Sequence, residues 1–240
     1  MRVSNFLLSV FAFCVAASSQ TIRDGAQSPE VLKDSRDGKS YKTVKIGNQV
    51  WMAENLNYEA SPSWCYNNEK ENCHKFGRYY FWSQAMQVCP AGWHLPSEQE
   101  FKALLKVADS KSRNKPGKAL KSKTGWRSDT YCSDPNCAWD PVYDSDCDCA
   151  GRLKTVSGNG TDALGFNVLQ SAVGMQDADG ISFNYGDVPD ACFWTSTKDE
   201  NSYSCLAVYA SGEADFYSGC ERDGTLGNPD VAYSVRCVKD

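Results

Sequence analysis

Beyond its first nineteen residues, the sequence has no apolar run near the roughly 18 residues that a membrane-spanning helix requires. It also lacks basic excess, because 25 lysines and arginines face 30 aspartates and glutamates, for a formal net charge of −5. It has only two histidines, His74 and His94, and no nucleophile motif accompanies either. These absences argue against a membrane span, against nucleic acid or an anionic membrane as partner, and against a catalytic triad.

The first nineteen residues differ from the rest of the chain. Arg2 precedes the apolar run FLLSVFAFCVAA, which ends in small residues. This pattern is typical of a secretory signal peptide, so we expect cleavage near Ser19 and Gln20. The mature chain is then secreted or associated with the cell envelope. The alternative is lipoprotein processing at Cys14, which the aromatic residue before this cysteine disfavours.

Cysteine is abundant, with twelve residues in the chain, eleven of them beyond the expected signal peptide. In an oxidising compartment this density predicts disulfides, and the odd number leaves at least one thiol free or bridging to another chain. Cys65 and Cys73 are close enough in sequence to close a small ring. Among Cys192, Cys205 and Cys220 we expect one pair, with the third as the free thiol.

The first half of the mature chain predicts a tether, a hairpin and two helices. Residues 20–33 are polar and aperiodic, so we expect a flexible tether. Two β-rich runs flank a Gly-Asn turn and predict a hairpin over residues 41–53. Residues 77–86 read as a short buried helix. Ser97 and Glu100 form a capping-box pattern ahead of a helix that ends near Asp109, and GKALKSKTGW then reads as a basic turn.

The second half is rich in short β-type runs separated by Gly, Asn and Asp, which predicts an antiparallel sheet. Helices early and strands late favour an α+β domain, which we expect to span residues 34–240. In the acidic run DADG, Asp177, Asp179 and Gly180 only partly resemble a calcium loop, so we favour a turn between strands and expect no cofactor. The alternative at DADG is a calcium ion, for which GNPD at residues 227–230 is a weaker candidate.

Residues 128–157 form a cysteine-rich, polar segment that reads as an inserted loop. It contains four cysteines, and the expected disulfides join Cys132 to Cys147 or Cys149 and Cys137 to the other. Zinc is the alternative, but the spacing lacks a pair of two-residue knuckles.

The inserted loop also carries aromatic residues that no helical or strand pattern requires, namely Tyr131, Trp139 and Tyr143. They either pack against the loop disulfides or form a platform for a ligand such as a sugar ring.

Several motifs occur in a characteristic order, namely DGKSYKTVKIGNQVWMAENLNY, GRYYFWSQAM, CPAGWHLPSEQEF, GKALKSKTGW, GNGTDALGFNVL, FWTST and YSVRCVKD. As a set they resemble the Fibrobacter succinogenes major paralogous domain. That family is similar to the C-type-lectin-like fold of formylglycine-generating enzymes, with two short helices beside a small twisted antiparallel sheet and long disulfide-stapled loops. The resemblance implies a bacterial envelope or extracellular setting. It also implies a disulfide between Cys89 and Cys237.

The resemblance implies no settled activity. With no assembled catalytic constellation in the sequence, we expect a non-catalytic exported domain that presents loops to a polysaccharide or a cell-envelope protein. One alternative is a relative of the copper-dependent formylglycine-generating oxidases, for which Cys205 and Cys220 are the candidate cysteines. The other is a purely structural envelope protein. His94 lies in a motif that packing explains, so we expect a structural role for it.

Overall fold

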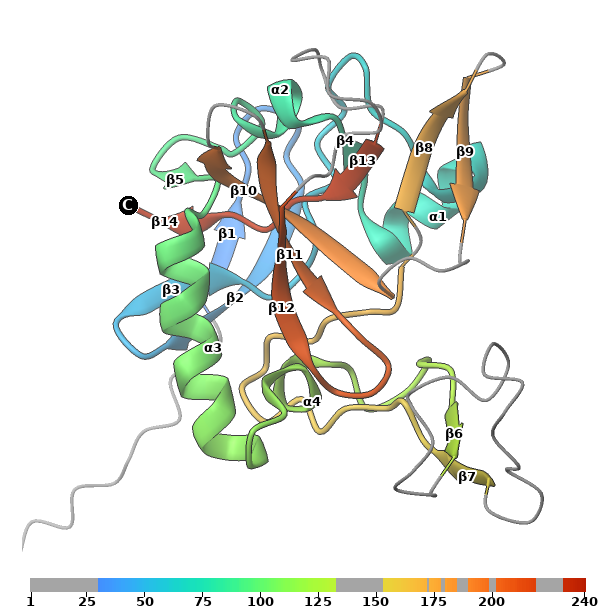
Figure 1. Ribbon diagram of the computed structural model, residues 1–240. Coiled ribbons are helices and arrows are strands. Elements are labelled where there is room, and N and C mark those ends of the chain that lie inside the picture. The colour runs from blue at the N-terminus through green and yellow to red at the C-terminus, as the bar shows by residue number, and fades with distance from the viewer. Residues whose placement is uncertain are drawn as a thin grey trace, which may run out of the picture.

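The computed structural model describes residues 30–132, 153–171, 173–177, 180–184, 190–198, 202–218 and 231–240, which form an α+β domain (Figure 1). Two sheets share the core, and the longest helix lies along one side of it. A two-stranded ribbon projects away from the main body. None of the helices in the described part has the length and apolar character needed to cross a membrane.

The first sheet is built from the N-terminal strands and the last strand of the chain. Its order is β1-β2-β3-β14-β5, with bounds Val31–Lys33, Ser40–Ile46, Gln49–Met52, Val238–Lys239 and Trp93–His94. The predicted hairpin is confirmed as β2 and β3, and Gly47 supplies the positive φ of +60° in its turn. Strand β1 pairs with β2, so the last three residues of the expected tether belong to the sheet.

The second sheet contains the late strands that the sequence predicts. Its order is β12-β11-β10-β13-β8-β9, with bounds Ala214–Ser218, Tyr203–Val208, Ala191–Lys198, Val231–Ser234, Val173–Asp177 and Gly180–Asn184. Strands β10 and β13 are parallel, and the other neighbours are antiparallel. Strands β8 and β9 are antiparallel neighbours with Asp177 opposite Gly180, so the DADG run lies between two paired strands, as expected.

The helices depart from the sequence expectations in number and length. The described residues contain a 3-10 turn at Tyr66–Asn68 and four α-helices: α1 (Lys70–Phe76), α2 (Trp82–Ala85), α3 (Glu98–Ser112) and α4 (Pro116–Leu120). The expected helix at 77–86 is wrong in its first half, because Tyr79–Tyr80 forms strand β4 on β13. Most of α4 falls within the expected basic turn, and Pro116 begins the helix at a position where its missing N–H is tolerated.

Helix α3 begins where the sequence predicts and ends three residues later than expected. The Ser97 hydroxyl accepts a hydrogen bond from the Glu100 amide, and the Glu100 carboxylate accepts one from the Ser97 amide, so the capping box is confirmed. The buried face of the helix packs into the core between the sheets, where the Phe101 ring lies 5.1 Å from that of Trp51. Together they fix α3 on the first sheet.

His94 joins the cap of α3 to the last residue. Its Nδ1 lies 2.6 Å from an Asp240 carboxylate oxygen and its Nε2 lies 2.8 Å from a Glu100 carboxylate oxygen. Partial burial lowers the pKa of His94, but its hydrogen bonds with Asp240 and Glu100 raise it more, so the net pKa lies above the ordinary value. The structural role expected for this residue is therefore that of an ionic clamp, a protonated imidazole that links the Asp240 and Glu100 carboxylates.

This clamp predicts a pH-dependent contribution to stability. Because the pKa of His94 is raised in the folded state, its stabilisation is complete below the unfolded pKa of about 6.5 and is lost as pH rises through the folded value. The difference in unfolding free energy between the native chain and His94→Gln should therefore be largest below about pH 6.5 and shrink over the pH range above it. Urea titrations across this range measure it, with His74→Gln as control. A difference that grows with pH would contradict the clamp.

Two disulfides join the described residues, Cys65–Cys73 and Cys89–Cys237, the pairings that the ring size and the family resemblance favour. Cys192 is a free thiol and only 2% exposed, so it is not placed to bridge to another chain. No disulfide joins Cys192 to Cys205, and Cys220 lies outside the described residues, so the expected pair in this late group stays a prediction.

The two ends of the expected inserted loop pair with each other. Strand β6 (Asp129–Cys132) is antiparallel to β7 (Leu153–Val156), and together they form the projecting ribbon of Figure 1. Residues 133–152, which include three of the four loop cysteines, lie outside the described residues.

Candidate functional site

A pocket of about 340 Å³ opens where the first sheet, the end of α1 and the final segment of the chain meet. Its size falls in the range of small-molecule sites. Five segments line it, contributing Lys39–Tyr41, Ala53–Asn57 except Leu56, Cys73–Gly77 except Phe76, Asn167 with Leu169, and Arg236. Because these segments are far apart in sequence, only the folded chain forms this site.

Arg236 is the most unusual residue of the pocket. It sits in the connection between β13 and β14, and its side chain is among the largest that are fully buried. Its Nε donates to the Asn55 side-chain oxygen at 2.8 Å, one terminal nitrogen donates to the Phe166 carbonyl, and the other donates to the Asn167 carbonyl at 3.0 Å. The guanidinium also lies over the Phe166 ring at 4.5 Å. All of these partners are electrically neutral.

Among the described residues, no carboxylate lies within ion-pair distance of Arg236. Burial therefore lowers its pKa to about 9, and the more distant charges of Asp162 and Glu54 offset only part of that effect. The group is still protonated at neutral pH. The pocket thus contains a desolvated cation without a close counter-charge, which is costly unless a ligand supplies one.

Other charged groups at the pocket are predominantly basic. Lys39 and Lys75 line it with Arg236, and Glu54 is the one lining carboxylate. Glu54 lies 3.7 Å from the Lys42 ammonium and accepts a hydrogen bond from the Lys42 amide, so its charge is partly compensated. Three cations minus one carboxylate leave a local charge of +2, with histidine neutral, on a protein whose overall charge is negative.

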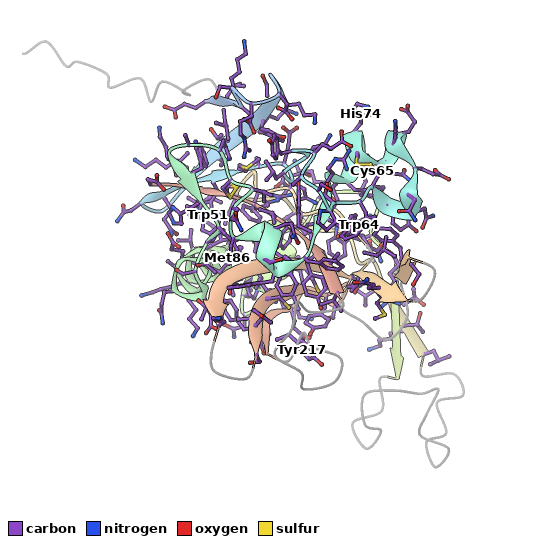
Figure 2. The ribbon with its side chains drawn as sticks, turned by 90° about the horizontal axis from the view of Figure 1, so that it is seen from above. Trp51, Trp64, Cys65, His74, Met86 and Tyr217 are labelled. Atoms are coloured by element: carbon purple, nitrogen blue, oxygen red, sulfur yellow. A yellow bond between two sulfur atoms is a disulfide. The ribbon has the colours of Figure 1, made fainter. Side chains whose placement is uncertain are left out.

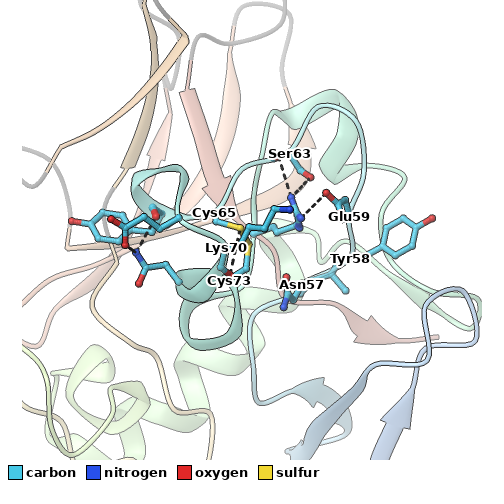
Figure 3. The surroundings of a disulfide bond; sticks show 12 residues. Asn57, Tyr58, Glu59, Ser63, Cys65, Lys70 and Cys73 are labelled. Atoms are coloured by element: carbon cyan, nitrogen blue, oxygen red, sulfur yellow. Dashed lines mark hydrogen bonds and ion pairs between the residues drawn. A yellow bond between two sulfur atoms is a disulfide. The ribbon is translucent and has the colours of Figure 1, made fainter.

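The wall formed by α1 is held in place by the shorter disulfide. Cys65–Cys73 anchors the helix, and Figure 3 shows this disulfide near Asn57. The Asn55 side-chain amide donates to the Phe76 carbonyl at 2.8 Å, so the same asparagine that binds Arg236 also binds the end of α1. His74 also lines the pocket, and it lies on the opposite side of the molecule from Tyr217 (Figure 2).

Gly77 allows α1 to approach Asn55. Its φ is +73°, and an added Cβ would lie 2.7 Å from the Asn55 Cβ and 2.8 Å from the Leu56 carbonyl oxygen. Backbone and branch-point atoms cannot move away as the end of a flexible side chain can. The position therefore accepts only glycine without displacing the pocket wall.

Substitution of Gly77 tests this close approach. We expect Gly77→Ala to lower the free energy of unfolding by roughly 2–3 kcal/mol, through backbone strain plus the steric clash. Gly38→Ala is the matched control, because Gly38 has a similar φ of +75° but nothing within 4 Å of its Cβ position. We expect the control to cost about 1 kcal/mol. Equal losses in urea unfolding would show that the close approach is absent.

The ligand-binding role that the sequence predicts for Tyr131, Trp139 and Tyr143 stays a prediction. Tyr131 is on strand β6, and its side chain, like Trp139 and Tyr143, falls outside the described residues. Among the described residues, no group of three or more His, Cys, Asp or Glu side chains is placed to hold a metal ion. Cys205, one of the two candidates for copper chemistry, is completely buried in the second sheet.

Sequence reasoning overlooked Arg236, although one signal was present. YSVRCVKD is an apolar run interrupted by a single arginine between Val235 and Cys237, and residues 231–238 are all buried. A charged residue inside a fully buried segment usually has a structural or binding role.

Comparison with known families agrees with the motif order of the sequence. The chain matches the Fibrobacter succinogenes major domain over residues 44–239. The protein belongs to this family. Neither a curated protein nor a solved structure matches the chain. In this member of the Fibrobacter succinogenes major domain family, the matched range includes most of the pocket lining, Arg236 among it, and also the inserted segment.

Proposed function

We propose that this protein is an exported, non-catalytic binding domain of C-type-lectin-like fold, and that its ligand is a polysaccharide. The observation that carries the proposal is the pocket lined by the buried Arg236 cation, which has no carboxylate within ion-pair distance among the described residues. The desolvation of a buried charge offsets part of what its hydrogen bonds contribute to folding, and a ligand of opposite charge would compensate that cost. The two disulfides support an extracellular setting.

Polar groups around Arg236 suit a hydroxylated ligand. Ser40, Asn57 and Tyr41 line the pocket and carry a hydroxyl, an amide and a phenol. The Tyr41 oxygen accepts a hydrogen bond from the Asn57 backbone N–H at 3.1 Å, and burial raises the pKa of Tyr41 to about 12, so its proton stays in place to be donated. Sugar hydroxyl groups both donate and accept, which matches this mixture.

The inserted segment is a second contact region in this proposal. Tyr131, Trp139 and Tyr143 provide flat faces on which sugar rings stack through their apolar surfaces. The ribbon of β6 and β7, which flanks this segment in the sequence, projects from the body of the domain, as Figure 1 shows. A polymer longer than one sugar unit has the length to contact more than one region of the surface.

Retention on a panel of insoluble polysaccharides and a glycan array tests the proposal. We expect binding to at least one glycan and weaker binding by Asn57→Ala, whose side chain makes no hydrogen bond to other described residues and whose loss should leave the fold intact. Trp139→Ala tests the inserted segment separately. No retention on any glycan, or retention that Asn57→Ala leaves unchanged, would overturn the assignment of the pocket.

A further inference from the structure

We propose that the pocket recognises the carboxylate of an acidic sugar unit, of the uronic acid type, which Arg236 and Lys75 bind together. This inference rests on the proposed function and specifies its ligand class. It follows from the charge of the lining, the unused donors of Arg236 and the neutral groups beside them.

The donors of Arg236 are not exhausted by the protein. A guanidinium has five N–H groups, and three are used by Asn55, Phe166 and Asn167. Each terminal nitrogen donates once to a carbonyl, so each retains one further N–H. Two N–H groups from one guanidinium match the two oxygens of a carboxylate, the geometry in which arginine binds most strongly.

The surroundings of Arg236 strengthen such a contact. The guanidinium is fully buried and lies near the rings of Phe166 at 4.5 Å and Phe193 at 5.4 Å, so little water competes for its charge. Opposite charges attract more strongly in this low-dielectric setting than at the surface. The three protein acceptors also fix the orientation of the guanidinium before a ligand arrives, which reduces the entropy lost on binding.

The rim of the pocket favours the same ligand charge. Lys75 is exposed at the end of α1 and has a cation–π contact with its neighbour Phe76 at 4.7 Å. Lys39 is already paired with Asp37 and donates to the Asn57 carbonyl, so Lys75 is the rim cation with the more available charge. A negatively charged protein that concentrates positive charge here attracts acidic ligands to this place rather than to its whole surface.

Calorimetric titration with a short oligogalacturonate tests the inference, with its fully methyl-esterified form and polyglutamate as comparison ligands. The ester preserves the sugar and removes the charge. We expect the acid to bind and the ester to bind at least tenfold more weakly. Rising sodium chloride should weaken the binding of the acid. Lys75→Met should reduce affinity roughly three- to tenfold, while Lys111→Met, an exposed lysine on α3, should leave it unchanged.

The outcomes separate this inference from the proposed function. Equal binding of acid and ester, lost in Asn57→Ala, would overturn the carboxylate and leave the glycan function intact. Tighter binding of polyglutamate than of the oligogalacturonate would overturn the sugar in favour of a protein ligand. If none of these probes and no glycan of the array binds, both proposals fail together.

Discussion

Removing the Cys89–Cys237 disulfide with Cys89→Ala/Cys237→Ala should lower the free energy of unfolding by about 5 kcal/mol. The bond joins residues 148 positions apart, and in the chain-entropy description such a long closed loop restricts the unfolded state strongly. The loss would be close to the total stability of many domains. Urea unfolding of the native and double-variant chains measures it.

Cys65→Ala/Cys73→Ala is the matched control, because it removes a disulfide that spans only eight positions. The same relation gives about 2.5 kcal/mol for this loop. The control should nevertheless weaken ligand binding, since Cys65–Cys73 holds the α1 wall of the pocket. Equal losses of stability from the two pairs would contradict the role of loop length.

Replacing Arg236 should have the second largest effect on stability. Arg236→Met keeps much of the volume but leaves the acceptors on Asn55, Phe166 and Asn167 without their donor. Hydrogen bonds to a charged group are worth about 1.5–3 kcal/mol each, and the desolvation of the guanidinium offsets part of their sum. We expect a net loss of roughly 2–4 kcal/mol in urea unfolding, and Arg236→Lys to recover only part of it.

A stabilising effect of Arg236→Met would mean that the three hydrogen bonds do not outweigh the desolvation of the charge. Such a result would agree with a binding role for the arginine but would contradict its role as a structural link.

The native chain with an acidic ligand present should unfold at a higher urea concentration than without it, because a ligand that binds only the folded state stabilises that state.

The sequence was most informative where local rules decide the structure. The β2–β3 hairpin follows from a glycine–asparagine turn between β-rich runs, and the start of α3 follows from Ser97 and Glu100. Both features depend on residues only a few positions apart. The late strands were predictable for the same reason, since β-branched and aromatic residues alternate with turn residues there.

Features that depend on distant residues were not predictable. Tyr79–Tyr80 has helical spacing with its neighbours, but the two tyrosines form a strand because they pair with Tyr233 and Ser234 of β13. The pocket depends on Asn55, Gly77 and Arg236, which the fold brings together from three separate segments. No local sequence pattern predicts that these segments come together, and the isolated arginine in a buried run was the one signal in the sequence.

The most direct test of the central claim observes Arg236 itself. In ¹⁵N-labelled native protein, the Nε–H signal of this buried guanidinium should exchange slowly with water and be visible by NMR at neutral pH. We expect this signal to shift and saturate as oligogalacturonate is added, with the midpoint found by calorimetry. A signal that stays unchanged while the saccharide binds would place the ligand elsewhere and contradict the assignment of the pocket.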